Sequence, residues 1–123
     1  MKAVLTRGPM HDRGLDISVG SSHGPARVFA PTWDMVLAYK RNQITAKQYM
    51  YQYTAILCKL DQSVFYNLAK RDRHLKCYCP NGTFCHTYLL IHHCVSRYPH
   101  LFTTDEDTRY IINQIVAGVY TAI

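Results

Sequence analysis

The sequence predicts a small single-domain α/β protein spanning residues 1–123, with a short, mostly parallel sheet flanked by about five helices. Three observations support this prediction. The length of 123 residues matches one domain of ordinary size. Hydrophobic residues make up 48% of the chain and charged residues 18%, which suits a packed core and excludes a disordered, collagen-like or solenoid protein. Strand-like and helix-like segments alternate along the chain, an order that is typical of α/β domains.

The N-terminal quarter is expected to contain two short strands within a loop-rich stretch. Lys2–Thr6 is β-branched and apolar, and it ends before the break formed by Gly8 and Pro9. Residues 7–31 hold four of the six glycines and three of the five prolines. Within them, Leu15–Val19 alternates apolar and polar side chains, which indicates a second strand.

Threonines at N-cap positions indicate where four of the helices begin. These caps are Thr32, Thr45, Thr83 and Thr104. The expected helices are Trp33–Arg41, Ala46–Leu60, Ser63–Arg71, Phe84–Arg97 and a last helix whose first turn is Asp105-Glu106-Asp107. Between the third and fourth helices, Leu75–Tyr78 is expected to form a buried strand that lies parallel to the first strand.

The charge balance favours anionic partners. Fourteen Lys and Arg residues against eight Asp and Glu residues give a formal charge of +6, which attracts phosphorylated small molecules and nucleic acids. The basic segment Lys70–Lys76 is the best candidate for a nucleic-acid contact, although a solvated connection is the simpler interpretation. No apolar run approaches the ~20 residues of a membrane span, and residues 1–8 lack a signal-peptide pattern. We therefore expect a cytoplasmic protein with no membrane partner.

A cysteine-rich loop carries most of the chemistry that the sequence indicates. Five cysteines in a chain without a signal pattern indicate thiols rather than a disulfide framework, and Cys77, Cys79 and Cys85 fall within nine residues. Cys85 is expected near the start of a helix, where the helix dipole stabilises a thiolate. His86 beside it can carry a proton. Cys85 and His86 are therefore the candidate catalytic residues.

The same strand, turn and helix start are expected to hold an anion on their backbone amides. The predicted ligand-binding residues are Arg7, Asp16, Cys77, Cys79, Asn81, Gly82 and Thr83. Arg7 follows the first strand and is expected beside the loop, the alternative being a solvated side chain. Asp16 could reach the same edge as a general acid or base, whereas such residues more often fix turns.

Two other interpretations of this loop stay open. Zn²⁺ takes about four sulfur or nitrogen ligands. Four such side chains stand within ten residues: Cys77, Cys79, Cys85 and His86. Adjacent helix residues point roughly 100° apart, so Cys85 and His86 would struggle to bind one ion together. We therefore expect no metal cofactor and keep zinc as the alternative. Cys77 by itself is equally consistent with an inert core thiol.

Two motifs resemble the YeaO-like family, which has no established reaction. The first motif combines Phe29–Lys40, with the sequence FAPTWDMVLAYK, the turn Gln43–Thr45, and the pair Tyr49 and Tyr53. The second motif is Leu75–Leu90, which contains a Cys-x-Cys pair followed by Cys-His.

The resemblance covers roughly residues 2–95. It implies a small α/β domain with a loose link to nucleotide or nucleic-acid processing and to conflict between phage and host. Thr87 stands where the family usually has Arg, so an expected anion clamp is missing, and Arg7 is the candidate to replace it. The compact arrangement is similar to versions found in bacteriophage genomes, which implies a protein that acts in the cytoplasm of a host cell.

Three functional hypotheses follow. In the first, the protein binds a phosphorylated small molecule, a nucleotide or a modified nucleobase at the cysteine-rich loop, and processes it if Cys85 and His86 are catalytic. In the second, it is a non-catalytic protein that binds a host protein through a basic, tyrosine-rich surface. The chain contains ten tyrosines. In the third, it binds nucleic acid through charge alone.

Overall fold

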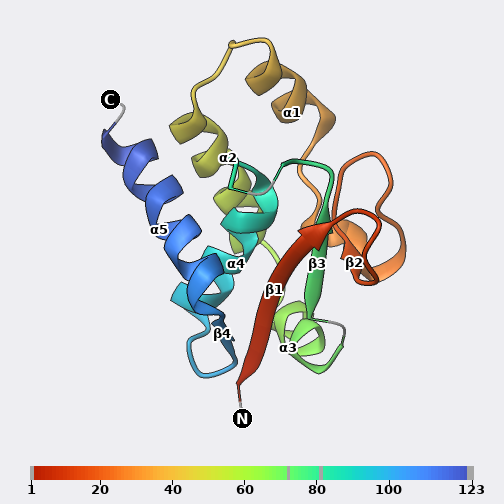
Figure 1. Cartoon of the computed structure of the whole chain (residues 1–123). Coiled ribbons are helices and arrows are strands. Elements are labelled where there is room, and N and C mark those ends of the chain that lie inside the picture. Colours follow the sequence, from red (N-terminus) through yellow and green to blue (C-terminus); the bar gives the residue numbers. More distant parts are fainter. Residues whose placement is uncertain (1, 72, 81, 122–123) are drawn as a thin grey trace.

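The computed structural model describes residues 2–71, 73–80 and 82–121. In this part of the chain, four strands form one sheet in the order β2-β3-β1-β4, and all three pairings are parallel (Figure 1). The strands are β1 (Ala3–Pro9), β2 (Leu15–Asp16), β3 (His74–Cys77) and β4 (Phe102–Thr104). The predicted α/β class is confirmed. The predicted parallel pairing of the first strand with the strand before the cysteine-rich turn is confirmed as well.

The helices of the described residues lie between and beside these strands. They are α1 (Trp33–Lys40), α2 (Ala46–Cys58), α3 (Gln62–Lys70), α4 (His86–Arg97), α5 (Glu106–Thr121) and the short 3₁₀ helix η1 (Gly24–Phe29). Helix α4 is central, because it contacts β1, β3 and β4 as well as α2 and α5. No helix in the described part of the chain is both long and apolar enough to cross a membrane.

Local signals set the starts of α1 and α2 as the sequence predicted. The hydroxyl of Thr32 accepts a hydrogen bond from the backbone N–H of Met35 at 3.2 Å. Thr45 and Gln48 form a reciprocal capping box, with bonds of 2.8 and 3.1 Å between each side chain and the other's backbone N–H. Each cap satisfies amide groups that a helix start leaves without partners.

Strand β1 separates a buried face of the sheet from an exposed one. Ala3 and Leu5 are buried beneath the helices, whereas Val4 between them is 44% exposed. Side chains two residues apart share a face, so Arg7 continues the line of Ala3 and Leu5 toward α4. This alternation explains how a charged side chain reaches the interior at the carboxyl end of the strand.

A hydrogen-bonded chain ties β1 to β3 across the other face. The hydroxyl of Thr6 is bonded to His74 Nδ1 at 2.6 Å, and His74 Nε2 is bonded to Asp12 Oδ2 at 2.9 Å. A Cβ atom on Gly8 would overlap the Asp12 carboxylate and the His74 ring, so glycine at this position allows their close approach. The backbone N–H of Asp12 also donates to Pro9 O in a turn.

The C-terminal part of the chain differs from the prediction. The three residues of β4 were missed, because the Thr104 hydroxyl was assigned to a helix cap. In the structure that hydroxyl donates to Leu5 O at 2.6 Å, and β4 pairs with β1 from Ala3↔Phe102. Asp105 caps α5 instead, accepting from the Thr108 N–H at 3.1 Å. So short a strand is defined by its pairing and not by a sequence pattern.

The predicted cap at Thr83 is also wrong. Its hydroxyl donates to Pro80 O at 2.6 Å within the turn, and α4 begins later, after Cys85. The second strand is shorter than predicted, because only Leu15 and Asp16 pair with β3. Strand β1 is longer, because parallel pairing with β3 continues to Pro9.

Replacing Tyr53 with Phe is expected to lower the free energy of unfolding by about 1–2 kcal/mol. The Tyr53 ring is fully buried and its hydroxyl donates to Phe29 O at 2.6 Å, so the variant leaves a buried carbonyl without its donor. Urea unfolding measures the change. The matched control is Tyr51→Phe, since Tyr51 is 52% exposed, and it should stay within about 0.5 kcal/mol of the parent. Equal stability of both variants would contradict the assigned hydrogen bond.

Candidate functional site

A cavity of about 280 Å³ lies beyond the carboxyl ends of β2 and β3. Ligands bind at this edge in open α/β sheets, and the sequence predicted the site there. Its walls come from the loop after β2, from α1 and α2, and from the turn between β3 and α4. The lining residues are Ser18, Val19, Gly20, Trp33, Val36, Tyr39, Lys40, Tyr49, Cys77, Tyr78, Cys79, Phe84, Cys85 and His86.

Aromatic rings form much of the wall. Tyr39, Tyr49 and Phe84 contact one another with ring centroids 5.3–5.6 Å apart. Trp33 and Tyr78 also line the cavity, and they are 54% and 66% exposed, which places them where it opens to solvent. The cavity therefore combines a packed aromatic wall with two rings accessible from outside.

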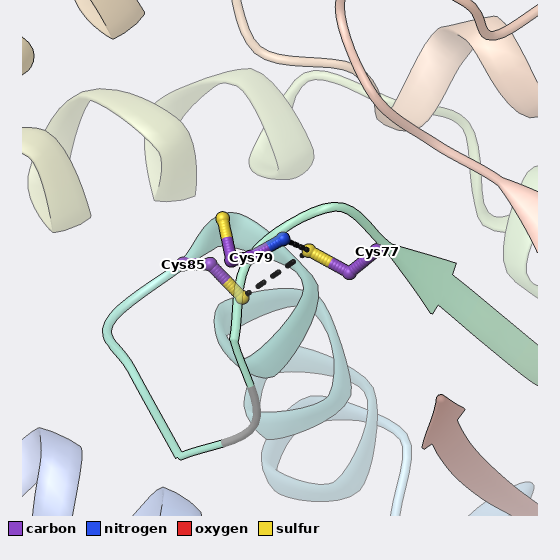
Figure 2. Close-up of side chains that lie close together, drawn as sticks. All are labelled: Cys77, Cys79 and Cys85. Atoms are coloured by element: carbon purple, nitrogen blue, oxygen red, sulfur yellow. Dashed lines mark hydrogen bonds between the residues drawn. The ribbon is translucent and has the colours of Figure 1, made fainter. Parts of the chain in front are cut away.

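Three cysteines meet at one side of this cavity (Figure 2). Cys77 ends β3, Cys79 follows two residues later, and Cys85 is the N-cap residue of α4. Their Sγ atoms all lie within 4.8 Å of one another, and those of Cys77 and Cys85 are 3.8 Å apart. The N–H of Cys79 donates to Cys77 Sγ at 3.3 Å. Cys77 and Cys85 are buried, whereas Cys79 is half-buried.

The contacts within this cluster favour the thiolate form at Cys77 over the other two cysteines. Hydrogen bonds from the Cys79 and Cys85 thiols and from the Cys79 amide hold the pKa of Cys77 well below its usual value. The same contacts with Cys77 raise the pKa of Cys79 and of Cys85. The sequence predicts a thiolate at Cys85, whereas the contact with Cys77 raises the pKa of Cys85. Cys85 is the N-cap residue of α4, in extended backbone geometry.

Arg7 lies beside the cluster, as its place at the end of the first strand predicted. One guanidinium N–H group donates to Cys79 O at 2.7 Å, and the guanidinium carbon lies 4.5 Å from the centre of the Tyr88 ring. Burial opposes the charge on Arg7, but Cys85 and Cys77 outweigh this effect, so the pKa of Arg7 is raised. Arg7 thus fixes the turn and supplies a positive charge next to the sulfur atoms.

His86 lies against the cavity but not in the sulfur cluster. Its Nε2–H donates to Ile17 O at 3.0 Å, and its ring meets the Tyr53 ring edge-on at 5.7 Å. Burial lowers the pKa of His86, so the ring is neutral at pH 7. Among the described residues, the metal-type cluster consists of the three cysteines alone, so His86 does not complete the four-ligand zinc set.

The remaining predicted ligand residues are Asp16, at the end of β2, and those of the segment between β3 and α4. The Gly82 N–H donates to the Tyr88 hydroxyl at 3.0 Å and the Thr83 N–H donates to Pro80 O at 3.2 Å, so both amides bond within the protein. Asn81 lies outside the described residues.

Asp16 orders the loop that borders the cavity. Its carboxylate accepts from the Ser18 N–H, the Ser18 hydroxyl and the Ser21 hydroxyl, and these bonds outweigh burial and lower its pKa. The Tyr78 hydroxyl donates to Ser21 Oγ at 3.2 Å and joins this loop to the turn. Asp16 is therefore placed as a loop-ordering residue behind the lining side chains.

The aromatic wall is the part of the site that the sequence analysis missed. Trp33, Val36 and Lys40 follow one face of α1 at helical spacing, a pattern that indicates a shared surface. Tyr49 was assigned to a core stripe, and its ring is indeed buried, but part of it lines the cavity. The spacing of these residues does not indicate which loop packs against this face of α1.

Comparison with family models, curated proteins and solved structures finds no match to this chain. The resemblance to the YeaO-like family therefore stays a prediction.

Proposed function

We propose that the protein binds a nucleotide or a modified nucleobase, with the planar ring system in the aromatic cavity and one ring edge facing the cysteine cluster. The observation that carries this proposal is the cavity of about 280 Å³ with aromatic walls and sulfur atoms at one side. Small-molecule sites begin near about 300 Å³, so the cavity suits one ring system and not a dinucleotide. Stacking of a base on an aromatic side chain contributes about 1–3 kcal/mol.

The charges around the cavity support a phosphorylated ligand. Lys40, at the end of α1, is an exposed side chain that lines the cavity, where its ammonium group can meet a phosphate outside the ring pocket. The formal charge of +6 raises the local concentration of anions at the surface. Among the described residues, the tyrosines with the most exposed rings lie on different elements, namely α2, α3, α5 and the turn after β3.

Fluorescence of Trp33, the only tryptophan of the chain, reports ligand binding directly. Titration with the common nucleoside monophosphates and free bases should give saturable quenching for at least one of them, because the stacked ring contacts the indole. Tyr78→Ala should weaken that binding roughly 5- to 150-fold, the equivalent of one stacking contact.

The control for this experiment is Tyr110→Ala, because Tyr110 has the same 66% exposure as Tyr78 but lies on α5. It should leave the dissociation constant unchanged. The proposed function is wrong if no nucleotide or base gives saturable quenching, or if Tyr110→Ala weakens binding as much as Tyr78→Ala does.

A further inference from the structure

We propose that Cys77, Cys79 and Cys85 bind one Zn²⁺ ion through their Sγ atoms and leave its fourth coordination position open toward the aromatic cavity. The three side chains come from the end of β3, the turn and the start of α4, and they converge on one point (Figure 2). This site goes beyond the proposed function, since it concerns a metal and not the planar ligand.

The distances fit a tetrahedral thiolate site. Zn–S bonds of about 2.3 Å in tetrahedral geometry place neighbouring sulfur atoms about 3.8 Å apart. The Sγ atoms of Cys77 and Cys85 are already 3.8 Å apart. The Sγ atoms of the other two pairs lie within 4.8 Å of each other. Zinc binding therefore requires these sulfur–sulfur distances to shorten by at most about 1 Å. Side-chain rotation at the half-buried Cys79 is enough for such a movement.

The surroundings supply the charge and the hydrogen bonds that such a site needs. A zinc ion with three thiolates carries a net charge of −1, and the Arg7 guanidinium next to the cluster balances it. The Cys79 N–H already donates to Cys77 Sγ. Thr87 is fully buried, and its hydroxyl acts as a hydrogen-bond donor to the Cys77 sulfur, so it can donate to that sulfur when a metal is bound. Groups of this kind orient the ligands of metal sites.

The fourth position faces the cavity because no side chain of the described residues fills it. Neither ring nitrogen of His86 lies within the cluster, and no other His, Cys, Asp or Glu joins it in the described part of the chain. All three cysteines line the aromatic cavity, so water or a bound ligand completes the coordination. If the proposed function holds, that ligand is a base that presents a ring nitrogen or a sulfur atom at its edge.

Zinc binding is tested by competition with a chromophoric chelator after the purified chain has been stripped of metal. We expect one Zn²⁺ per chain, and Co²⁺ in its place should give thiolate-to-cobalt charge-transfer absorption with the intense visible bands of tetrahedral geometry. Cys79→Ser should weaken binding by more than about 100-fold, and Arg7→Gln, which removes the balancing charge, by about 10- to 100-fold.

The control variant is Cys58→Ser, since Cys58 is an exposed thiol outside the cluster, and it should bind zinc as the parent does. Cys79→Ser alters the half-buried member of the cluster, and thermal unfolding verifies that the variant is folded. Absence of stoichiometric zinc, or equal losses in Cys58→Ser and Cys79→Ser, overturns the site.

Addition of the nucleotide or base to the Co²⁺ protein separates this inference from the proposed function. A shift of the visible bands supports a ligand at the fourth position. If the protein shows tetrahedral cobalt bands but binds no nucleotide in any assay, the metal site is supported and the proposed function is rejected. If the protein binds a nucleotide but takes up neither zinc nor cobalt, the metal site is rejected and the proposed function is supported.

Discussion

Replacing Leu90 with Ala is expected to lower the free energy of unfolding by about 3–4 kcal/mol. Leu90 is completely buried on α4, the helix that contacts three strands and two helices. The smaller side chain loses the transfer free energy of its buried carbon atoms and leaves a cavity that neighbouring elements fill only in part. Because α4 begins directly after Cys85, the same change should loosen the sulfur cluster. Urea unfolding followed by circular dichroism measures the loss.

The matched control is Leu37→Ala on α1, which makes the same chemical change at a side chain that is 37% exposed. It should cost at most about half as much as Leu90→Ala, because more than a third of the Leu37 side chain is already exposed to solvent. Comparable losses in the two variants would show that α4 is not the centre of the core.

Arg7→Gln is expected to lower the free energy of unfolding by about 2–4 kcal/mol. The variant removes the charged donor to Cys79 O and the contact of the guanidinium with the Tyr88 ring. It also removes the positive charge that lies next to Cys85 and Cys77. Hydrogen bonds to charged groups contribute about 1.5–3 kcal/mol, and the contact with the ring adds roughly 0.5–1 kcal/mol.

Two further variants test the cause of this loss. Arg7→Lys should lie between the parent and Arg7→Gln, because lysine keeps the charge but lacks the planar group that stacks on Tyr88. Arg13→Gln, at an exposed arginine, should stay within about 0.5 kcal/mol of the parent. Loss of stability in Arg13→Gln as large as in Arg7→Gln would mean that overall charge, and not the position of Arg7, is responsible.

Much of the fold could be predicted because its signals are local. The caps at Thr32 and Thr45 act within three residues of the chain, so their sequence patterns are sufficient. Strand β4 could not be predicted in the same way, because its three residues become a strand only by pairing with β1, about 100 positions away in the chain. The role of Thr104 could not be predicted either. Its hydroxyl could cap a helix or form a hydrogen bond between strands, and only the tertiary structure shows that it bonds to Leu5 O.

The same difference between local and long-range signals decides which features of the candidate site could be predicted. The spacing of the cysteines and the parallel pairing of the first strand with the strand before them were enough to predict that Arg7 lies beside the sulfur cluster. The lowered pKa of Cys77 was not predictable, because it depends on which thiols and amides lie around its sulfur atom. The aromatic wall on α1 was not predictable either, since more than forty residues separate Trp33 from Cys77 and no local pattern states that they meet.

Alkylation of the cysteines in metal-free protein, with and without nucleotide, tests most directly whether a ligand occupies the cavity above the sulfur cluster. Trypsin cleavage after Lys76 and Arg97 places the cluster in the peptide 77–97, whereas the exposed Cys58 lies in the peptide 48–59. Saturating nucleotide should slow iodoacetamide labelling of Cys79 and leave labelling of Cys58 unchanged. Identical labelling of Cys79 in the presence and absence of a nucleotide that binds would show that the ligand lies elsewhere.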